Sequence, residues 1–216
     1  MVRPMIKVVV FDFDGTLVDS NHFKGNAWYA VFTDDPKISP PIVADVLSCN
    51  VGTRFDIARD ILVRSGTPAS EINLLVEKYA ARFDELVQKA IADRGLILDA
   101  RKVLDALSLQ HCLYLNSGTP ESALLVSVER LGIKSYFKGV YGTPPTKEEN
   151  LRGIIGREGV DTREVVVVGD GEGDWRAAQE CGARFIAIAS GFHDWSSYTE
   201  GFPVISGIHE IEKYLT

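Results

Sequence analysis

The chain has 216 residues, of which 45% are hydrophobic, and a formal net charge of −7. This length and apolar content suffice for a core domain and a smaller second unit. The acidic balance, without any basic run, argues against nucleic acid or an anionic membrane surface as the main partner. No apolar stretch approaches the ~20 residues of a membrane span. We therefore expect a globular protein that binds neither nucleic acid nor membrane.

Three cysteines, Cys49, Cys112 and Cys181, are scattered through apolar or helical contexts. Their odd number and their spacing suit neither a disulfide framework nor a zinc site. They are typical of reduced thiols, which predicts a cytoplasmic protein.

Short apolar runs rich in Val, Ile, Tyr and Phe predict five strands, which alternate with helical patterns from residue 100 onward. Such alternation is typical of an α/β fold with a doubly wound parallel sheet. The runs are apolar at nearly every residue, as expected where helices cover both faces. One predicted helix is Glu121–Leu131, which ends at Gly132. The predicted strands are residues 6–12, 111–117, 136–141, 164–170 and 184–190.

Residues 20–94 contain no strand-like run and predict an inserted bundle of helices. Asn21–Phe32 and Arg54–Ser65 have helical patterns, and Thr67-Pro68 opens a long helix. Prolines at positions 36, 40 and 41 predict a break between the first two helices. The sequence therefore predicts a core of residues 1–18 and 95–216 and a helical domain of residues 19–94.

Two carboxylates, Asp12 and Asp14, follow the buried run Val8–Phe11. Two like charges so close repel each other, so one must take up a proton or a cation must lie between them. The carboxyl end of such a strand is where open α/β sheets bind ligands. The alternative, a strand followed by a polar Asp-Gly turn, accounts for Gly15 but not for two acids before it.

Three later segments carry further candidate functional residues, each at a predicted strand end or helix start. Ser117 and Gly118 end a predicted strand, and Lys147 stands at a predicted helix start. Asp170 ends another buried valine run, and Asp174 follows four residues on. In this order, the acid pair, hydroxyl, lysine and second acid pair resemble the four motifs of the haloacid dehalogenase superfamily, specifically its aspartate-nucleophile phosphatases. This resemblance covers the whole chain.

The resemblance implies a Rossmann-like core, a helical cap over residues 19–94, and Mg²⁺ as the cofactor. It implies that Asp12 attacks phosphorus and that Asp14 protonates the leaving alcohol and then activates water. Asp12, the backbone carbonyl of Asp14, and Asp170 would hold the ion, and Asp174 would orient metal-bound water.

The resemblance further implies that Ser117 and the Gly118 amide hold phosphoryl oxygens, and that Lys147 pairs with Asp12 and neutralises phosphoryl charge. Two alternatives remain open. Ser117 can instead cap the following helix, and Lys147 can be a solvated lysine at a helix start.

Two cap residues resemble the substrate-binding positions of β-phosphoglucomutases. Lys24 stands where those mutases carry a histidine, and Gly52-Thr53-Arg54 resembles their arginine segment. We expect Arg54 to bind a second anionic group of the substrate bidentately, and Lys24 to contribute to binding the distal part of the substrate. Both can instead be ordinary surface charges on the cap helices.

The sequence thus predicts a Mg²⁺-dependent phosphatase of the phosphoglycolate phosphatase and β-phosphoglucomutase-like subgroup. Its substrate would be a small phosphorylated metabolite, such as a sugar or sugar-acid phosphate, and it would work as a monomer or a homodimer. The alternatives are a phosphosugar mutase, whose relatives usually have Glu-Asp where this chain has Gly169-Asp170, and a catalytically silent binding or regulatory module. Asp14 disfavours a metal-free dehalogenase.

Overall fold

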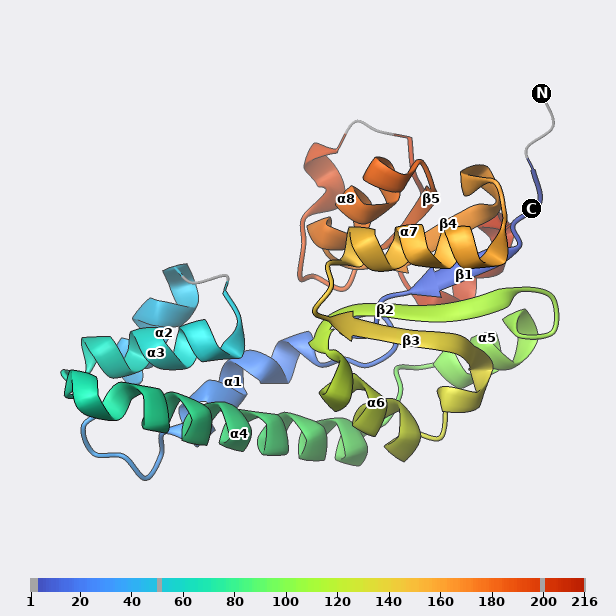
Figure 1. The fold of residues 1–216 in the computed structure, drawn as a ribbon. Coiled ribbons are helices and arrows are strands. Elements are labelled where there is room, and N and C mark those ends of the chain that lie inside the picture. Colours follow the sequence, from blue (N-terminus) through green and yellow to red (C-terminus); the bar gives the residue numbers. More distant parts are fainter. Residues whose placement is uncertain (1–3, 50–51, 199–200, 216) are drawn as a thin grey trace. The chain divides into compact units, whose positions relative to one another are not determined.

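The computed structural model describes residues 4–49, 52–198 and 201–215. The chain divides into two compact units, one formed by residues 1–19 with 94–216 and the other by residues 20–93. The first unit holds a parallel sheet and the second is helical (Figure 1). The predicted α/β fold with a helical insert between its first two strands is confirmed.

The sheet of the larger unit has the strand order β3-β2-β1-β4-β5-β6, and every pairing is parallel. The order reverses between β1 and β4, and open α/β sheets bind ligands at such a reversal. The strands are β1 (Val8–Phe11), β2 (Cys112–Pro120), β3 (Phe137–Thr143), β4 (Val165–Gly169), β5 (Arg184–Ile188) and β6 (Val204–Ile205).

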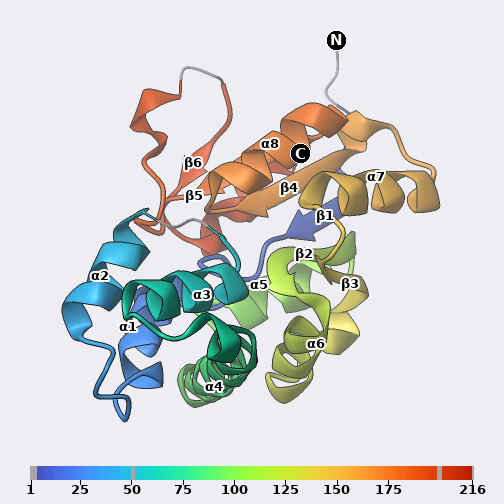
Figure 2. The ribbon, with the colours of Figure 1, turned by 60° about the vertical axis from the view of Figure 1, so that its left-hand side comes forward.

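Helices cover both faces of this sheet, which is why its central strands are apolar throughout. Every residue of β1 and of β4 is buried. Helices α7 and α8 lie on one face, and α5 and α6 lie on the other (Figures 1 and 2). The β-branched side chains of the central strands pack well on a sheet enclosed in this way. These helices are α5 (Ala100–Leu107), α6 (Glu121–Arg130), α7 (Lys147–Glu158) and α8 (Glu172–Cys181).

All five predicted strands are present, but the sequence pattern missed the sixth, β6. It is only two residues long, too short for an apolar run to be recognised. The remaining elements of this unit are short 3₁₀ helices: η1 (Lys134–Tyr136), η2 (Thr162–Glu164), η3 (Trp195–Ser197) and η4 (Ile208–Tyr214).

The helical unit is held together by aromatic packing between its first and last helices. The Trp28 ring stacks on Phe83 with centroids 4.3 Å apart. Phe32 packs on Tyr79 at 4.6 Å, and the Tyr79 hydroxyl donates to Asp35 at 2.7 Å. Aromatic pairs of this kind contribute beyond the area that they bury. The helices are α1 (Asn21–Val31), α2 (Pro40–Cys49), α3 (Arg54–Arg64) and α4 (Ala69–Arg94).

Helix α2 corrects one prediction. The prolines at positions 40 and 41 mark the start of a helix and not only a break. Proline is tolerated in the first turn because the backbone N–H that it lacks has no intrahelical partner there. Val43 and Val46 are the buried residues of α2. Within the described residues, no helix has the length and apolar character needed to cross a membrane.

Candidate active site

The first acid pair lies at the carboxyl end of β1. The Asp12 N–H donates to the Val168 carbonyl of β4 at 2.8 Å, which fixes Asp12 at the reversal of strand order. A tight turn follows, in which the Gly15 N–H donates to the Val18 carbonyl at 2.7 Å. Gly15 has φ +73°, a conformation that glycine adopts without a steric penalty. Asp12 is consequently buried, while Asp14 is half-buried.

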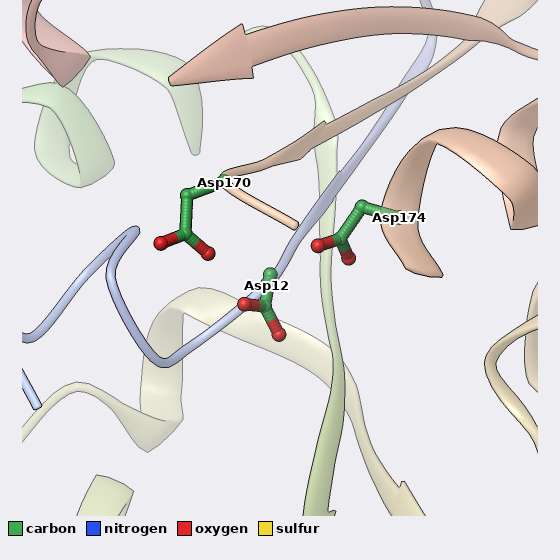
Figure 3. A group of neighbouring side chains, drawn as sticks. All are labelled: Asp12, Asp170 and Asp174. Carbon is green, nitrogen blue, oxygen red and sulfur yellow. The ribbon is translucent and has the colours of Figure 1, made fainter. Parts of the chain in front are cut away.

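The second acid pair lies at the end of the neighbouring strand β4. Asp170 follows this strand directly, and Asp174 is in the first turn of α8. Asp12, Asp170 and Asp174 are buried, and one carboxylate oxygen from each lies within 4.8 Å of the others. Their carboxyl groups face one another (Figure 3).

Gly169 permits this close approach. A Cβ on Gly169 would lie 2.2 Å from Cγ of Asp174, far inside van der Waals contact. The glycine before Asp170 therefore makes room for the carboxylate of Asp174.

Lys147 joins the two acid pairs. Its Nζ lies 2.9 Å from Oδ1 of Asp12 and 2.7 Å from Oδ1 of Asp174. It is the first residue of α7, which begins there because Thr146 and Glu149 form a reciprocal capping box. The Lys147 side chain is only 17% exposed, so it is not the solvated lysine of the alternative prediction.

The electrostatics of the cluster follow from burial. Burial and the neighbouring Asp174 raise the pKa of Asp12 to about 7. Burial likewise raises the pKa of Asp170 to about 6 and raises the pKa of Asp174. Burial would lower the pKa of Lys147, but the carboxylates of Asp12 and Asp174 hold that pKa above its ordinary value. The carboxylates thus need more positive charge than one lysine supplies.

The donor set of this cluster fits a divalent cation. With all three carboxylates ionised, the cluster and its one ammonium would carry a net charge of −2. Mg²⁺ prefers carboxylate oxygens and needs only one or two of them beside water and substrate oxygens. Asp12 and Asp170 can supply such ligands, and the pKa values raised by burial are those that a bound cation would lower.

Ser117 and Gly118 lie in an irregular part of β2. Asn116 pairs with Tyr141 and Pro120 pairs with Thr143, so residues 117–119 bulge from the ladder opposite Gly142. Bulges re-aim side chains and are common beside active sites. The Ser117 hydroxyl accepts the Thr119 N–H at 3.1 Å. Helix α6 starts at Glu121 without a side-chain cap, so Ser117 does not cap it.

Sequence reasoning missed a buried amide network beneath these residues. The Asn116 side chain donates to the Lys147 carbonyl at 2.8 Å. The Asn150 side chain donates to Asn116 Oδ1 at 3.1 Å and to the Gly142 carbonyl at 3.2 Å. The network ties the end of β2 to the start of α7. Asparagines within an apolar strand and a helix were the available signal, since buried amides need partners.

Two hydroxyl contacts were also missed. Ser190, just beyond β5, donates to Oδ2 of Asp170 at 2.5 Å. Thr119 donates to Oδ2 of Asp14 at 2.6 Å. Neither pairing has a sequence signal, because each depends on which strand ends lie side by side.

The two predicted cap residues lie near one carboxylate, Asp84 of α4. Arg54 Nη1 lies 2.7 Å from Asp84 Oδ1, and the Arg54 side chain is 16% exposed. Lys24 also acts electrostatically on Asp84, lowering the pKa of that carboxyl, although burial raises the pKa above its usual value. Among the described residues, the buried Nε of Arg54 has no hydrogen-bond partner. Arg54 is therefore not an ordinary solvated surface charge.

Comparison with known proteins shows the family. Residues 6–182 match the model of the haloacid dehalogenase-like hydrolases, so the chain belongs to this family. A curated relative, a phosphoglycolate phosphatase of Synechococcus elongatus, is 28% identical over 203 residues, which cover 92% of this chain and 91% of the relative. The predicted class of enzyme, a haloacid dehalogenase-like phosphatase, is confirmed.

Solved structures share the fold. A haloacid dehalogenase-like family hydrolase of Streptococcus pneumoniae has a TM-score of 0.73 at 21% identity, covering 98% of this chain and 99% of its own. The haloacid dehalogenase-type hydrolase YfnB of Bacillus subtilis, in a magnesium-bound crystal, has a TM-score of 0.75 at 16% identity. That match covers 98% of this chain and 99% of YfnB.

We predict that Gly169→Ala weakens Mg²⁺ binding by about tenfold or more. Mutation of a residue that supports the ligands of a metal typically lowers the affinity for that metal by about 10–100-fold. The added Cβ must push the carboxylate of Asp174 away from the cluster. Calorimetric titration with Mg²⁺ measures the change. Gly153→Ala on α7, where an added Cβ meets nothing within 4 Å, is the matched control and should bind Mg²⁺ normally. Equal affinity in both variants would contradict the role given to Gly169.

Proposed function

We propose that this protein is a Mg²⁺-dependent phosphatase that hydrolyses a small phosphorylated metabolite through an aspartyl-phosphate intermediate. The observation that carries the proposal is the buried Asp12 carboxylate, bridged by Lys147 to Asp174 and adjoined by Asp170. A nucleophile at the carboxyl end of β1, with cationic charge beside it, is what a dianionic phosphate ester requires.

Binding of the phosphoryl group would use three groups of the core. Lys147 neutralises part of its charge, and the Ser117 hydroxyl and the Gly118 amide donate to its oxygens. An added Cβ on Gly118 would meet nothing within 4 Å, which supports open space beside this backbone. The amide network from Asn116 to Asn150 holds the Ser117 and Lys147 segments in a fixed relation.

In the chemical step, a carboxylate oxygen of Asp12 forms the new bond to phosphorus as the ester P–O bond breaks. Asp14 gives its proton to the departing oxygen, which leaves as an alcohol. Asp14 then takes a proton from the water that hydrolyses the aspartyl phosphate, and Asp12 is regenerated. When bound, Mg²⁺ supplies positive charge that stabilises the transferring phosphoryl group. Asp12, the Asp14 carbonyl and Asp170 would hold it, with Asp174 orienting its water.

The substrate we propose is a small ester with a second negative group, such as 2-phosphoglycolate or another sugar-acid phosphate. The phosphoglycolate phosphatase of Synechococcus elongatus supports this class. In the cap, Lys24 and Arg54 carry two positive charges against the one negative charge of Asp84. Two cationic side chains in one region of the cap suit a carboxylate or a second phosphate. A cytoplasmic location and a monomer or homodimer remain predictions.

A screen of phosphorylated metabolites with Mg²⁺ tests this proposal. We expect release of inorganic phosphate, with 2-phosphoglycolate among the better substrates. A phosphosugar mutase would instead return an isomerised phosphosugar without free phosphate. No turnover of any ester would favour the silent binding module.

We predict that Asp12→Asn lowers kcat by roughly 10⁴-fold or more, the scale seen when a nucleophile is removed. The amide keeps the shape of the carboxyl group but is a poor nucleophile and a weaker metal ligand. Phosphate release and circular dichroism measure activity and fold. Asp93→Asn, which alters an exposed surface ion pair on α4, is the control. Near-native turnover by Asp12→Asn would remove Asp12 from the nucleophile role.

We predict that chelation by EDTA abolishes turnover and that added Mg²⁺ restores it. Asp170→Ala should need at least tenfold more Mg²⁺ for half-maximal rate, because the ion loses a carboxylate ligand. Rates measured across a Mg²⁺ titration test both statements. Full activity in the chelator would exclude the proposed metal dependence.

We predict that Arg54→Ala and Lys24→Ala impair 2-phosphoglycolate far more than p-nitrophenyl phosphate, which has no second anion. The lost charge-assisted contact should lower kcat/KM for the preferred ester by about thirtyfold, corresponding to ~2 kcal/mol. Arg82→Ala, which removes a more exposed cap arginine paired with Asp34, is the matched control.

Arg54→Ala also leaves Asp84 without its guanidinium partner, so thermal unfolding of each variant must be compared. The double variant Arg54→Ala/Asp84→Asn removes the unpaired charge while keeping the specificity defect. Equal losses on both esters would assign Arg54 to cap folding, and no loss on either would assign it no part in specificity.

A further inference from the structure

The hydroxyl of Thr119 makes a short hydrogen bond to the side chain of Asp14. Its Oγ1 donates to Oδ2 of Asp14 at 2.6 Å, although the two residues are 105 positions apart. Both residues belong to the larger unit and both are half-buried. A hydrogen bond from a hydroxyl to an ionised carboxylate is stronger than one between two neutral groups. It therefore restrains the rotation of the Asp14 carboxyl group.

The bulge of β2 places Thr119 at this position. Residues 117–119 leave the ladder with β3 between the Asn116–Tyr141 and Pro120–Thr143 pairs. A regular strand would point Ser117 and Thr119 to the same face and keep both within the ladder. In the bulge, the Thr119 N–H instead donates to the Ser117 hydroxyl while its own hydroxyl reaches Asp14.

Thr119 therefore connects two groups with different tasks. Ser117 belongs to the proposed phosphate-binding segment, and Asp14 is the proposed proton donor and acceptor. A proton donor contributes only when its acidic oxygen is aligned with the departing ester oxygen. A bond to each of the two groups fixes the direction of the Asp14 carboxyl relative to the phosphoryl oxygens.

We propose that Thr119 is a positioning residue that selects which oxygen of Asp14 carries the transferred proton. Its hydroxyl holds Oδ2 as a hydrogen-bond acceptor, and the proton resides on Oδ1.

In the first step, Asp12 forms the P–O bond, the ester P–O bond breaks, and the proton passes from Oδ1 of Asp14 to the departing oxygen. In the second step, the attacking water forms a bond to phosphorus, the bond between Asp12 and phosphorus breaks, and Oδ1 of Asp14 takes the proton of that water. This inference rests on the proposed function, because it assumes that Asp14 is the acid.

Esters whose leaving groups differ in basicity distinguish the loss of a positioned proton donor from a general loss of activity. A weakly basic leaving group such as p-nitrophenolate departs without a proton, whereas a phenolate or an alkoxide needs one. The value of kcat/KM reports the steps up to the first irreversible event, which includes departure of the leaving group. The test therefore compares p-nitrophenyl phosphate, phenyl phosphate and 2-phosphoglycolate at saturating Mg²⁺.

Thr119→Val removes the hydroxyl but keeps the shape and the backbone N–H. We expect kcat/KM to fall about tenfold for 2-phosphoglycolate, less for phenyl phosphate, and by no more than about twofold for p-nitrophenyl phosphate. Thr119→Ser, which keeps the hydroxyl, should recover most of the loss. The inhibition constant of inorganic phosphate should not change, since the hydroxyl does not bind the phosphoryl group.

Thr143→Val is the matched control. The Thr143 hydroxyl donates its proton to the Gly118 carbonyl at 3.3 Å, in the same bulge, and therefore does not donate it to Asp14. In Thr143→Val, any change in kcat/KM should be the same for all three esters. Equal losses on all three esters in Thr119→Val, a changed inhibition constant for phosphate, or no rescue by serine would each overturn the inference.

Asp14→Asn separates failure of this inference from failure of the proposed function. Loss of the acid should cost on the order of 10²–10⁴-fold with 2-phosphoglycolate and much less with p-nitrophenyl phosphate. If Asp14→Asn shows this dependence and Thr119→Val does not, only the role of Thr119 is wrong. If Asp14→Asn lowers the rates of all three esters equally, Asp14 is not the acid and the role of Thr119 is wrong with it, whereas phosphate release by the unmodified protein still supports the proposed phosphatase. No phosphate release from any ester by the unmodified protein would instead overturn the proposed function.

Discussion

The contact of the Lys147 ammonium with Asp12 and Asp174 is the constraint on which the arrangement of the core depends. Buried carboxylates that repel each other are tolerated only when cations lie among them. Lys147 and Asp12 are 135 positions apart, yet parallel strands bring their segments to one edge of the sheet. Removing one partner of such a buried ion group typically costs ~3–5 kcal/mol. The residues that we assign to chemistry therefore also hold the ends of β1, α7 and α8 together.

The groups around this contact divide the work between charge and direction. Lysine and carboxylates set the charge, whereas uncharged groups set orientation: the amides of Asn116 and Asn150, and the hydroxyls of Thr119 and Ser190. A buried amide network that is fully partnered specifies one arrangement without adding charge. The cap differs, because there a charged group, the Asp84 carboxylate, holds the guanidinium of Arg54.

Much of this could be predicted from the sequence, because the deciding signals are local. Asp12 and Asp170 follow unbroken valine-rich runs, and such runs predict both the strand and the place where it ends. Thr119 and Ser190 gave no such signal, since their partners depend on a bulge in β2 and on the neighbouring positions of strand ends. Helix α2 was missed because Pro40 and Pro41 favour both a break and a helix start. Strand β6 was too short for any periodicity to develop.

The insertion of the helical unit after β1 also affects how the core assembles. Val8 pairs with Cys112 on one side and with Val165 on the other, so the central strand has no partner until much later segments of the chain are present. Loop closure over such separations slows folding, whereas the intervening helices can form from local contacts. During synthesis on the ribosome, the apolar β1 segment emerges before the strands that pair with it and must wait for them. In the folded protein, a hydrogen bond from the Ile97 N–H to the Leu17 carbonyl at 3.0 Å joins the segments on either side of the insertion.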